Sequence, residues 1–133
     1  MIVVVDRAKT HAAVQSFRDL YVWQKSMELT VNVYRLTRGF PREEAFGLTA
    51  QLRRSAVSVP SNIAEGHGRM NPREFKRFLL IARGSICELR TQLELAGALE
   101  FADSLLVKTA LKQSLEVEKM LFALLGNLKN KTG

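Results

Sequence analysis

Basic side chains recur at helical spacing between residues 73 and 90. Lys76, Arg83 and Arg90 stand seven residues apart, which places them on one face if the segment is a helix. Ammonium and guanidinium groups bind phosphate oxygens without reading base sequence. We therefore predict a nucleic-acid-binding surface on the second and third of four expected helices. Its candidate residues are Arg53, Arg54, Arg69, Arg73, Lys76, Arg77, Arg83 and Arg90.

A solvated helix face is the alternative to this phosphate-binding surface. Glu74 lies within one helical turn of Arg73 and Arg77, so local pairing could neutralise part of the stripe. We expect no aromatic residues between the cations, so base stacking is not predicted. The charge distribution favours the phosphate-binding surface over the solvated helix face. The 133-residue chain has a formal net charge of +7, and residues 35–90 hold eleven basic and five acidic residues, a net of +6.

A second group of polar residues lies in residues 51–69. Asn62 and Glu65 are three residues apart and share one side of a helix. One interpretation is a general acid–base pair of Glu65 with His67, as a nucleic-acid hydrolase would need. We favour a buried hydrogen-bonded network that fixes helix packing, because buried polar groups must be paired. Its predicted members are Gln51, Ser58, Asn62, Glu65 and Glu88.

The remaining residues that could do chemistry form no recognisable site. His11 and His67 lack the spaced cysteines or carboxylates of a metal centre. No serine stands in a nucleophile motif, and no glycine-rich phosphate loop is present. Cys87 is the single cysteine, so no intrachain disulfide is expected and a reducing, cytoplasmic setting is predicted. We therefore predict no catalytic residue, metal, cofactor, small-molecule substrate or enzymatic activity.

Targeting and membrane segments are not predicted either. The apolar run of residues 1–5 is short and is followed by Asp6, unlike a signal peptide. No segment approaches the roughly 18 apolar residues of a membrane span. No membrane partner is therefore expected.

Apolar residues recur at spacings of three and four over four segments, which predicts four helices. The first begins near Asp19, the second starts after Pro41, the third follows the N-cap Asn71, and the fourth extends to about residue 129. Short connections between long helices predict an all-α, antiparallel up-down-up-down four-helix bundle over residues 17–130. Residues 1–16 are expected to form an irregular arm, either a tail or a segment lying on a neighbouring molecule.

Pro60 interrupts the second helix. Its missing N–H leaves the Ala56 carbonyl without its usual partner. The helix either continues with a kink or ends near Val57 and restarts. We favour the kinked continuous helix, because the apolar period passes through Pro60. Its predicted apolar residues are Phe46, Leu48, Leu52, Ala56, Val59 and Ile63.

The third and fourth helices carry the clearest core patterns. Gly84 and Ser85 of the third are small enough to let another helix approach closely. The third helix is expected to bury Phe75, Leu79, Ala82, Ile86, Leu89, Leu93 and Ala96. The fourth is expected to bury Leu106, Ala110, Gln113, Val117, Met120 and Leu124. Further leucines surround the fourth helix, more than one bundle seam requires, which predicts that another subunit covers it.

Three stretches of the chain carry a family resemblance. They are residues 19–25 (DLYVWQK), residues 51–66 (QLRRSAVSVPSNIAEG) and residues 78–85 (FLLIARGS) with Glu88 and Leu89. Together they resemble the small bacterial four-helix bundle proteins encoded within intervening sequences of 23S rRNA genes. They are similar, more distantly, to accessory variability proteins of diversity-generating retroelements. The resemblance implies a ring-like homopentamer with a basic surface and a nucleic-acid or ribonucleoprotein role, and it implies no established enzyme activity.

The residues and the resemblance lead to one functional prediction. The protein is expected to be a non-catalytic oligomeric scaffold that binds RNA or DNA backbone, or a ribonucleoprotein, through the basic surface. The alternative is a protein-only interaction module that binds no nucleic acid.

Overall fold

A computed structural model describes residues 14–132 of the protein and the side chains of residues 14–128. Over this range the chain forms four long helices, α1 (Tyr21–Thr37), α2 (Leu48–Gly68), α3 (Pro72–Ala98) and α4 (Ser104–Thr132). Two short 3-10 helices, η2 (Phe17–Asp19) and η3 (Arg42–Glu44), precede α1 and α2. The described range contains no strand, so the predicted all-α class is confirmed. Of the expected N-terminal arm, residues 1–13 lie outside the described residues.

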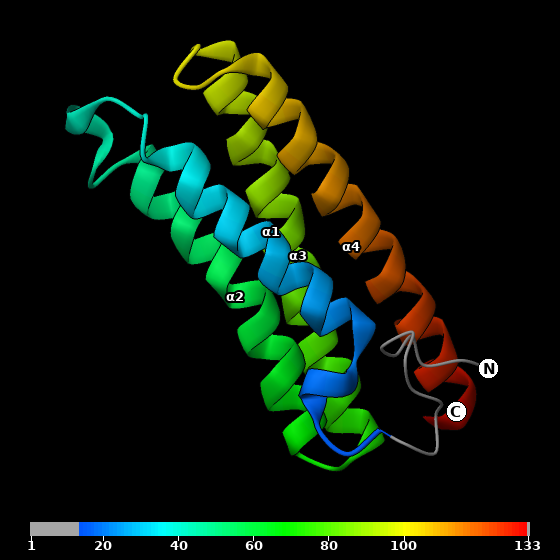
Figure 1. Cartoon of the computed structure of the whole chain (residues 1–133). Helices are drawn as coiled ribbons and strands as arrows, with labels where there is room; N and C mark the ends of the chain where they lie inside the picture. Colours follow the sequence, from blue (N-terminus) through cyan, green and yellow to red (C-terminus); the bar gives the residue numbers. More distant parts are fainter. Residues whose placement is uncertain (1–13, 133) are drawn as a thin grey trace.

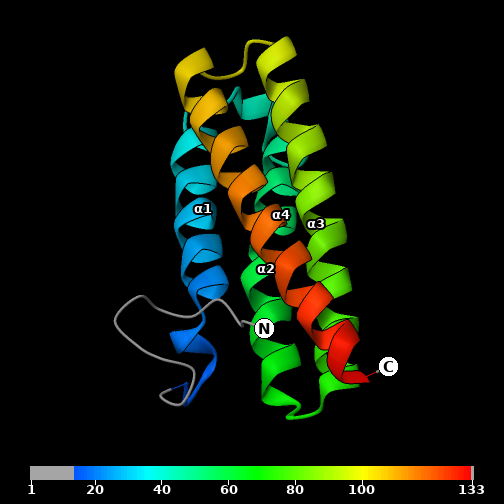
Figure 2. The same ribbon diagram turned by 90° about the vertical axis from the view of Figure 1, so that its right-hand side faces the viewer.

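The four long helices lie side by side as a bundle, and successive helices run in alternating directions (Figures 1 and 2). Each helix packs against two others, in the cyclic order α1, α2, α3, α4. The groove between α1 and α2 therefore lies on the opposite side of the bundle from the groove between α3 and α4. In the same way, the α2–α3 interface lies opposite the α1–α4 interface.

The core face of α3 is the one that its sequence predicts. Residues at alternating spacings of four and three share one stripe of a helix, and here that stripe faces the other three helices. All seven predicted core residues are buried, namely Phe75, Leu79, Ala82, Ile86, Leu89, Leu93 and Ala96.

The core face of α4 agrees with the predicted one in part, because Ala110, Val117 and Leu124 are buried as expected. Leu106 is 53% exposed, whereas its neighbour Val107 is 5% exposed and belongs to the core. Gln113 lies at the edge toward α1, where its Oε1 accepts a hydrogen bond from Asn32 at 2.9 Å. Leucines flank the buried stripe on both sides, so periodicity alone does not separate them. The residues that α4 buries are Val107, Ala110, Ser114, Val117, Leu121, Leu124, Leu125 and Leu128.

The start of α2 lies later in the chain than predicted. The residues after Pro41 form η3, and α2 begins at Leu48. The Oε1 atom of Glu44 accepts a hydrogen bond from the Leu48 N–H at 3.1 Å and so satisfies one donor of the first turn. Phe46, which was expected on the apolar side of the helix, lies in the connection and is 99% exposed.

Pro60 is accommodated inside α2, which continues through it as one helix. The interpretation of two separate helices is therefore wrong, while the kink stays a prediction. The Thr30 hydroxyl of α1 lies 3.1 Å from the Ala56 carbonyl oxygen that proline leaves unpaired. It also lies 2.7 Å from the Ser26 carbonyl oxygen. Because a hydroxyl carries one hydrogen, Thr30 donates to one of the two at a time. A neighbouring helix thus supplies the donor that Pro60 lacks.

A close approach of α2 and α3 occurs at Gly66 and not at the predicted Gly84. A Cβ atom on Gly66 would lie 2.7 Å from the Phe78 Cβ, while Gly84 has no such neighbour within 4 Å. Ser85, the other small residue expected at a contact, is buried and reaches Ser58 across this interface.

Side chains cap the starts of the elements. Asn71 caps α3 as predicted, because its Oδ1 accepts hydrogen bonds from two N–H groups of the first turn. Asp103 does the same for α4, accepting from the Leu105 N–H at 2.8 Å. Asp19, expected near the start of α1, instead closes a capping box with Ser16 around η2.

Candidate nucleic-acid interface

The groove between α3 and α4 contains part of the predicted basic stripe. Arg83 and Arg90 of α3 line it together with residues of α4, and its volume is about 320 Å³. The residues that α4 contributes are Leu115, Glu118, Lys119 and Phe122. Lys76 stands two helical turns before Arg83 and therefore lies on the same face of α3.

Arg90 is the anchored member of this groove. Its Nη1 forms an ion pair with the Glu118 carboxylate of α4. Its Nε is buried and has no hydrogen-bond partner among the described residues. One acid already neutralises Arg90, and part of its guanidinium is out of contact with solvent. We infer that Arg90 holds α3 to α4 more than it offers charge to a ligand.

Arg83 and Lys119 are the available cations of the groove. The Arg83 guanidinium lies 5.7 Å from the centre of the Phe122 ring, and the Phe122 side chain is 65% exposed. Among the described residues, neither Arg83 nor Lys119 has an ion-pair partner. We expected no aromatic residue between the cations and therefore no base stacking. Along α3 the sequence offers none beside Arg83, but the packing of α4 places the Phe122 ring there. Spacings of four and three between Leu115, Lys119 and Phe122 are the signal that places all three on one face of α4.

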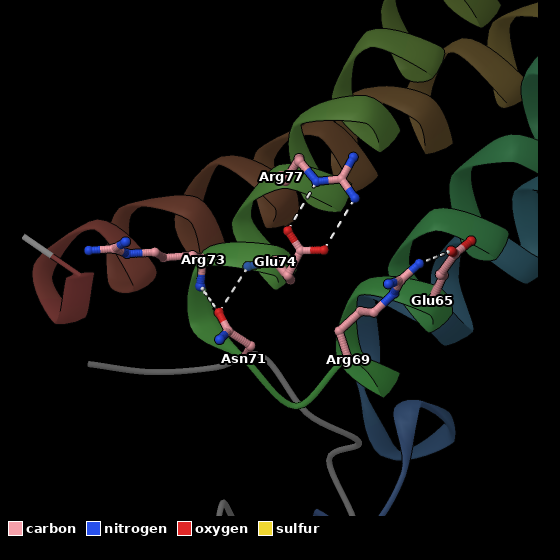
Figure 3. Close-up of polar contacts among 6 residues, drawn as sticks. All are labelled: Glu65, Arg69, Asn71, Arg73, Glu74 and Arg77. Atoms are coloured by element: carbon pink, nitrogen blue, oxygen red, sulfur yellow. Dashed lines mark hydrogen bonds and ion pairs between the residues drawn. The ribbon is translucent and has the colours of Figure 1, made fainter.

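The N-terminal turns of α3 pair their charges locally (Figure 3). Arg77 donates two hydrogen bonds to the Glu74 carboxylate, at 3.1 and 3.2 Å. Hydrogen bonding and attraction from Arg77 lower the pKa of Glu74, and Glu74 raises the pKa of Arg77 in turn. Arg69 forms a similar ion pair with Glu65 at 2.9 Å. Arg73 points away from both pairs in Figure 3 and is exposed.

Phe78 lies between these two paired arginines. The guanidinium of Arg77 is 4.4 Å from the centre of its ring, and that of Arg69 is 5.2 Å away. Phe78 itself is only 6% exposed, so the cations cover the ring and leave no platform for a ligand. Arg69 and Arg77 therefore stabilise the α2–α3 turn, while Arg73 and Lys76 keep their charge free of any described carboxylate.

The two adjacent arginines of α2 face different neighbours. Arg53 donates a hydrogen bond from Nε to the Thr37 hydroxyl at 2.9 Å and lies 4.6 Å from the centre of the Tyr34 ring, both in α1. Arg54 instead lines a cleft between α2 and α3. The predicted cations thus do not form one surface. Arg83 and Arg90 line the α3–α4 groove, Arg54 lines the α2–α3 cleft, and Arg53 contacts α1 on the opposite side of the bundle from Arg83.

The predicted polar network exists in part, between α2 and α3. The hydroxyls of Ser58 and Ser85 lie 2.7 Å apart, and Asn62 Nδ2 donates to Ser58 Oγ at 3.0 Å. A second rung joins the Ser55 hydroxyl to Gln92 Oε1 at 2.8 Å. Ser55, Ser85 and Gln92 were missing from the prediction, because only the pairing of two helices brings them together.

The other predicted members of the network lie at or beyond its edge. Gln51 contributes its backbone carbonyl, whose oxygen lies 2.9 Å from the Ser55 hydroxyl. Because that hydroxyl carries one hydrogen, Ser55 donates to Gln51 or to Gln92 at any one time. Glu88 lines the cleft beside the network. Glu65 is exposed and pairs with Arg69, so it lies outside the network.

The geometry does not bring Glu65 and His67 together as an acid–base pair. Glu65 hydrogen-bonds Arg69, whereas the His67 ring packs edge-on against Phe75 at 5.7 Å between centres. Burial lowers the pKa of His67, and attraction to Asp19 opposes that shift in part. His67 therefore favours its neutral form in the fold.

Metal-ligand clusters and membrane-length apolar helices do not occur in the described part of the chain. No group of three or more histidine, cysteine, aspartate or glutamate side chains there is placed to hold a metal ion. None of the helices in that part of the chain is both long and apolar enough to cross a membrane.

The match to a known family covers the whole site. The family model of the 23S rRNA-intervening sequence proteins matches residues 18–123. The chain belongs to this family. The matched span of this intervening sequence protein includes all eight predicted cations, the α2–α3 network and Phe122. No curated protein matches the chain.

A solved structure is similar to this intervening sequence protein. It is a crystal structure of a protein with unknown function from the S23 ribosomal protein family of Bacteroides thetaiotaomicron VPI-5482. The two share 26% sequence identity and a TM-score of 0.73, over 79% of this chain and 95% of the other. The bundle is therefore common to both proteins along nearly the full length of the second.

Proposed function

We propose that the protein is a non-catalytic, homo-oligomeric scaffold that binds the phosphate backbone of RNA or DNA, alone or in a ribonucleoprotein, at the α3–α4 groove. The observation that carries the proposal is the arrangement of Arg83 and Lys119. They come from two helices, line one groove, and have no ion-pair partner among the described residues. Lys76 extends the same face of α3.

Free cations favour nucleic acid for a physical reason. Each phosphate that a lysine or arginine neutralises releases condensed counterions, which drives binding and makes it salt-dependent. The net charge of +7 adds a general attraction that raises the association rate. Paired cations such as Arg69 and Arg77 must first give up their own carboxylates, so they contribute less.

Phe122 extends the proposal from phosphates to bases. Its ring is largely exposed beside Arg83. Stacking of one base on an aromatic side chain contributes about 1–3 kcal/mol and tolerates any base. An unpaired base of a loop or single strand can reach such a ring, which favours single-stranded over fully duplex nucleic acid.

The α1–α4 side of the bundle supports the oligomeric part of the proposal. Met27 and Val31 of α1 are 40% and 44% exposed, and Leu106 of α4 is 53% exposed. All three line clefts between α1 and α4. Large exposed apolar patches often mark contacts with another protein. We propose a homopentamer, so that light scattering returns a mass near five times 15.0 kDa. A monomer would contradict this part.

The nucleic-acid part is tested with charge reversals in the groove. Arg83→Glu with Lys119→Glu is expected to weaken binding of a single-stranded RNA at least about tenfold at low salt. The slope of the logarithm of affinity against the logarithm of salt concentration should also become shallower, by about 0.7 for each phosphate that the variant no longer neutralises. Fluorescence anisotropy across a salt series measures both quantities.

A matched control separates the groove from general charge. Arg38→Glu with Arg42→Glu makes the same change in net charge at two exposed residues outside the groove. The control should retain most of the binding. Equal losses in the two double variants would assign binding to net charge alone and so contradict the groove.

A protein-only interaction module is the second candidate. The observation that favours it is the apolar lining of the same groove, since Leu115 and Phe122 are 38% and 65% exposed. In that case the wild-type protein binds no nucleic acid even at low salt, and Phe122→Ala removes binding of a protein partner.

A further inference from the structure

The cleft between α2 and α3 is a second concave site, on another side of α3 from the groove. Its volume is about 250 Å³. Seven polar or charged residues line it, and no apolar side chain does: Gln51, Arg54, Ser55, Ser58, Ser85, Glu88 and Gln92. Most pockets for small molecules are mainly apolar with a few polar groups, so an all-polar lining points to a polar ligand.

The floor of this cleft is buried and ordered by hydrogen bonds. Ser55, Ser85 and Gln92 are 4%, 8% and 7% exposed. The Ser58–Ser85 and Ser55–Gln92 hydrogen bonds span it, at 2.7 and 2.8 Å. Gln92 uses its oxygen in this bond, while its amide N–H groups make no hydrogen bond to a described residue. The floor therefore keeps donors for a bound molecule without having to rearrange.

The rim of the cleft carries two opposite charges. Arg54 comes from α2 and Glu88 from α3, and both are exposed. Neither forms an ion pair with a described residue, although they share one cleft. A simple anion would be attracted by Arg54 and repelled by Glu88. A simple cation would be attracted by Glu88 and repelled by Arg54. A molecule with both charges satisfies both side chains.

We propose that the cleft binds a small zwitterion that carries one carboxylate and one ammonium group, such as a free amino acid or a short ω-amino acid. Arg54 binds the carboxylate with its forked N–H groups, and Glu88 accepts from the ammonium group. The hydroxyls and the Gln92 amide bind the polar atoms between them. A volume of about 250 Å³ is below that of sites for drug-sized ligands and fits a molecule of this size.

The test is isothermal titration calorimetry on the full chain, free of nucleic acid. The probes are glycine, L-serine, β-alanine and γ-aminobutyrate, each titrated to about 10 mM. Sodium acetate and methylammonium chloride serve as single-charge analogues. At least one zwitterion is expected to bind, and both analogues should bind at least about tenfold more weakly.

Two variants assign the binding to the cleft. Arg54→Gln and Glu88→Gln are each expected to weaken zwitterion binding at least about tenfold. Arg73→Gln and Glu94→Gln change exposed residues outside the cleft and should leave zwitterion binding unchanged. Circular dichroism and light scattering show whether each variant keeps its helices and its assembly.

Three results would overturn the proposal. The first is the absence of binding by every zwitterion. The second is equal binding by the wild type and by both cleft variants. The third is a change of oligomer mass in the cleft variants, which would mean that a second copy of the chain covers the cleft.

Discussion

The two sides of α3 are built from different residues and do different work. Toward α2 it presents the polar side chains of Ser85 and Gln92, which hydrogen-bond across the interface, and it lies close to α2 where Gly66 faces Phe78. Toward α4 it presents Arg83 and Arg90, which line a groove together with long side chains of α4. Close helices need small residues, whereas long side chains hold helices apart and stay partly exposed. The position of a cation around a helix therefore decides whether it is free to bind.

Two adjacent residues of α4 test where the core ends and the groove begins. Leu121→Ala removes a side chain with 0% exposure and should cost about 2–5 kcal/mol of unfolding free energy. Phe122→Ala removes a larger side chain that is 65% exposed, and should change stability by less than about 0.5 kcal/mol. Urea unfolding followed by circular dichroism measures both. Equal costs would mean that Phe122 is also a core residue.

Two glycines test the closeness of α2 and α3. Gly66→Ala places a Cβ atom against Phe78 and should destabilise the fold by about 1–3 kcal/mol. Gly84→Ala lies on a helix face with open space, so it should stabilise by about 0.5–1 kcal/mol. The melting temperature should therefore shift in opposite directions in the two variants. A rise for Gly66→Ala would show that the two helices can move apart without penalty.

The hydrogen bonds between α2 and α3 are tested at Ser55. Ser55→Ala removes the donor to Gln92 Oε1 and should cost about 1 kcal/mol, because water from the cleft can replace part of it. Ser61→Ala, at an exposed residue of the same helix, is the matched control and should change little. Denaturant titration of both variants gives the difference. If Ser55→Ala lowers the unfolding free energy no more than Ser61→Ala does, the Ser55–Gln92 hydrogen bond adds nothing to stability.

The smallest effect is expected from His67, at the α2 end of the same interface. Burial lowers its pKa in the folded state below the ordinary value of 6.5. The unfolded chain therefore binds more protons just below pH 6.5, so this contribution to stability is full above that pH and declines as the pH falls. Unfolding free energies at pH 7.5 and 5.5 should differ less in His67→Gln than in the wild type. An unchanged pH dependence in the variant would contradict the assignment to His67.

Local signals in the sequence were enough for the elements and for one whole core face. The period of three and four residues predicted the buried stripe of α3, and Asn71 marked its start. On α4 the same period was correct only in part, because leucines occur on both sides of the buried stripe. The prediction that Phe46 lies on the apolar side of α2 was wrong for a related reason. Its spacing from the other apolar residues does not show whether the helix has already begun at that residue.

The candidate site depended on contacts that no local pattern contains. Sequence spacing identified Arg83 and Arg90 as neighbours on one face. Only the packing of α4 showed that Glu118 engages Arg90, while Phe122 lies beside Arg83. Ser58 was predicted in a network, but its partner Ser85 lies on another helix.

What the sequence alone determined is therefore the four long helices, the Asn71 cap of α3 and the all-α class. These follow from hydrogen bonds and side-chain spacings within a few residues, which the chain carries wherever it lies. The tertiary structure decided which cations are paired, which hydroxyl serves the Ala56 carbonyl, and which side of α4 is buried. These depend on the rotation of each helix about its own axis. That rotation is set by the packing of all four helices together and not by any one of them.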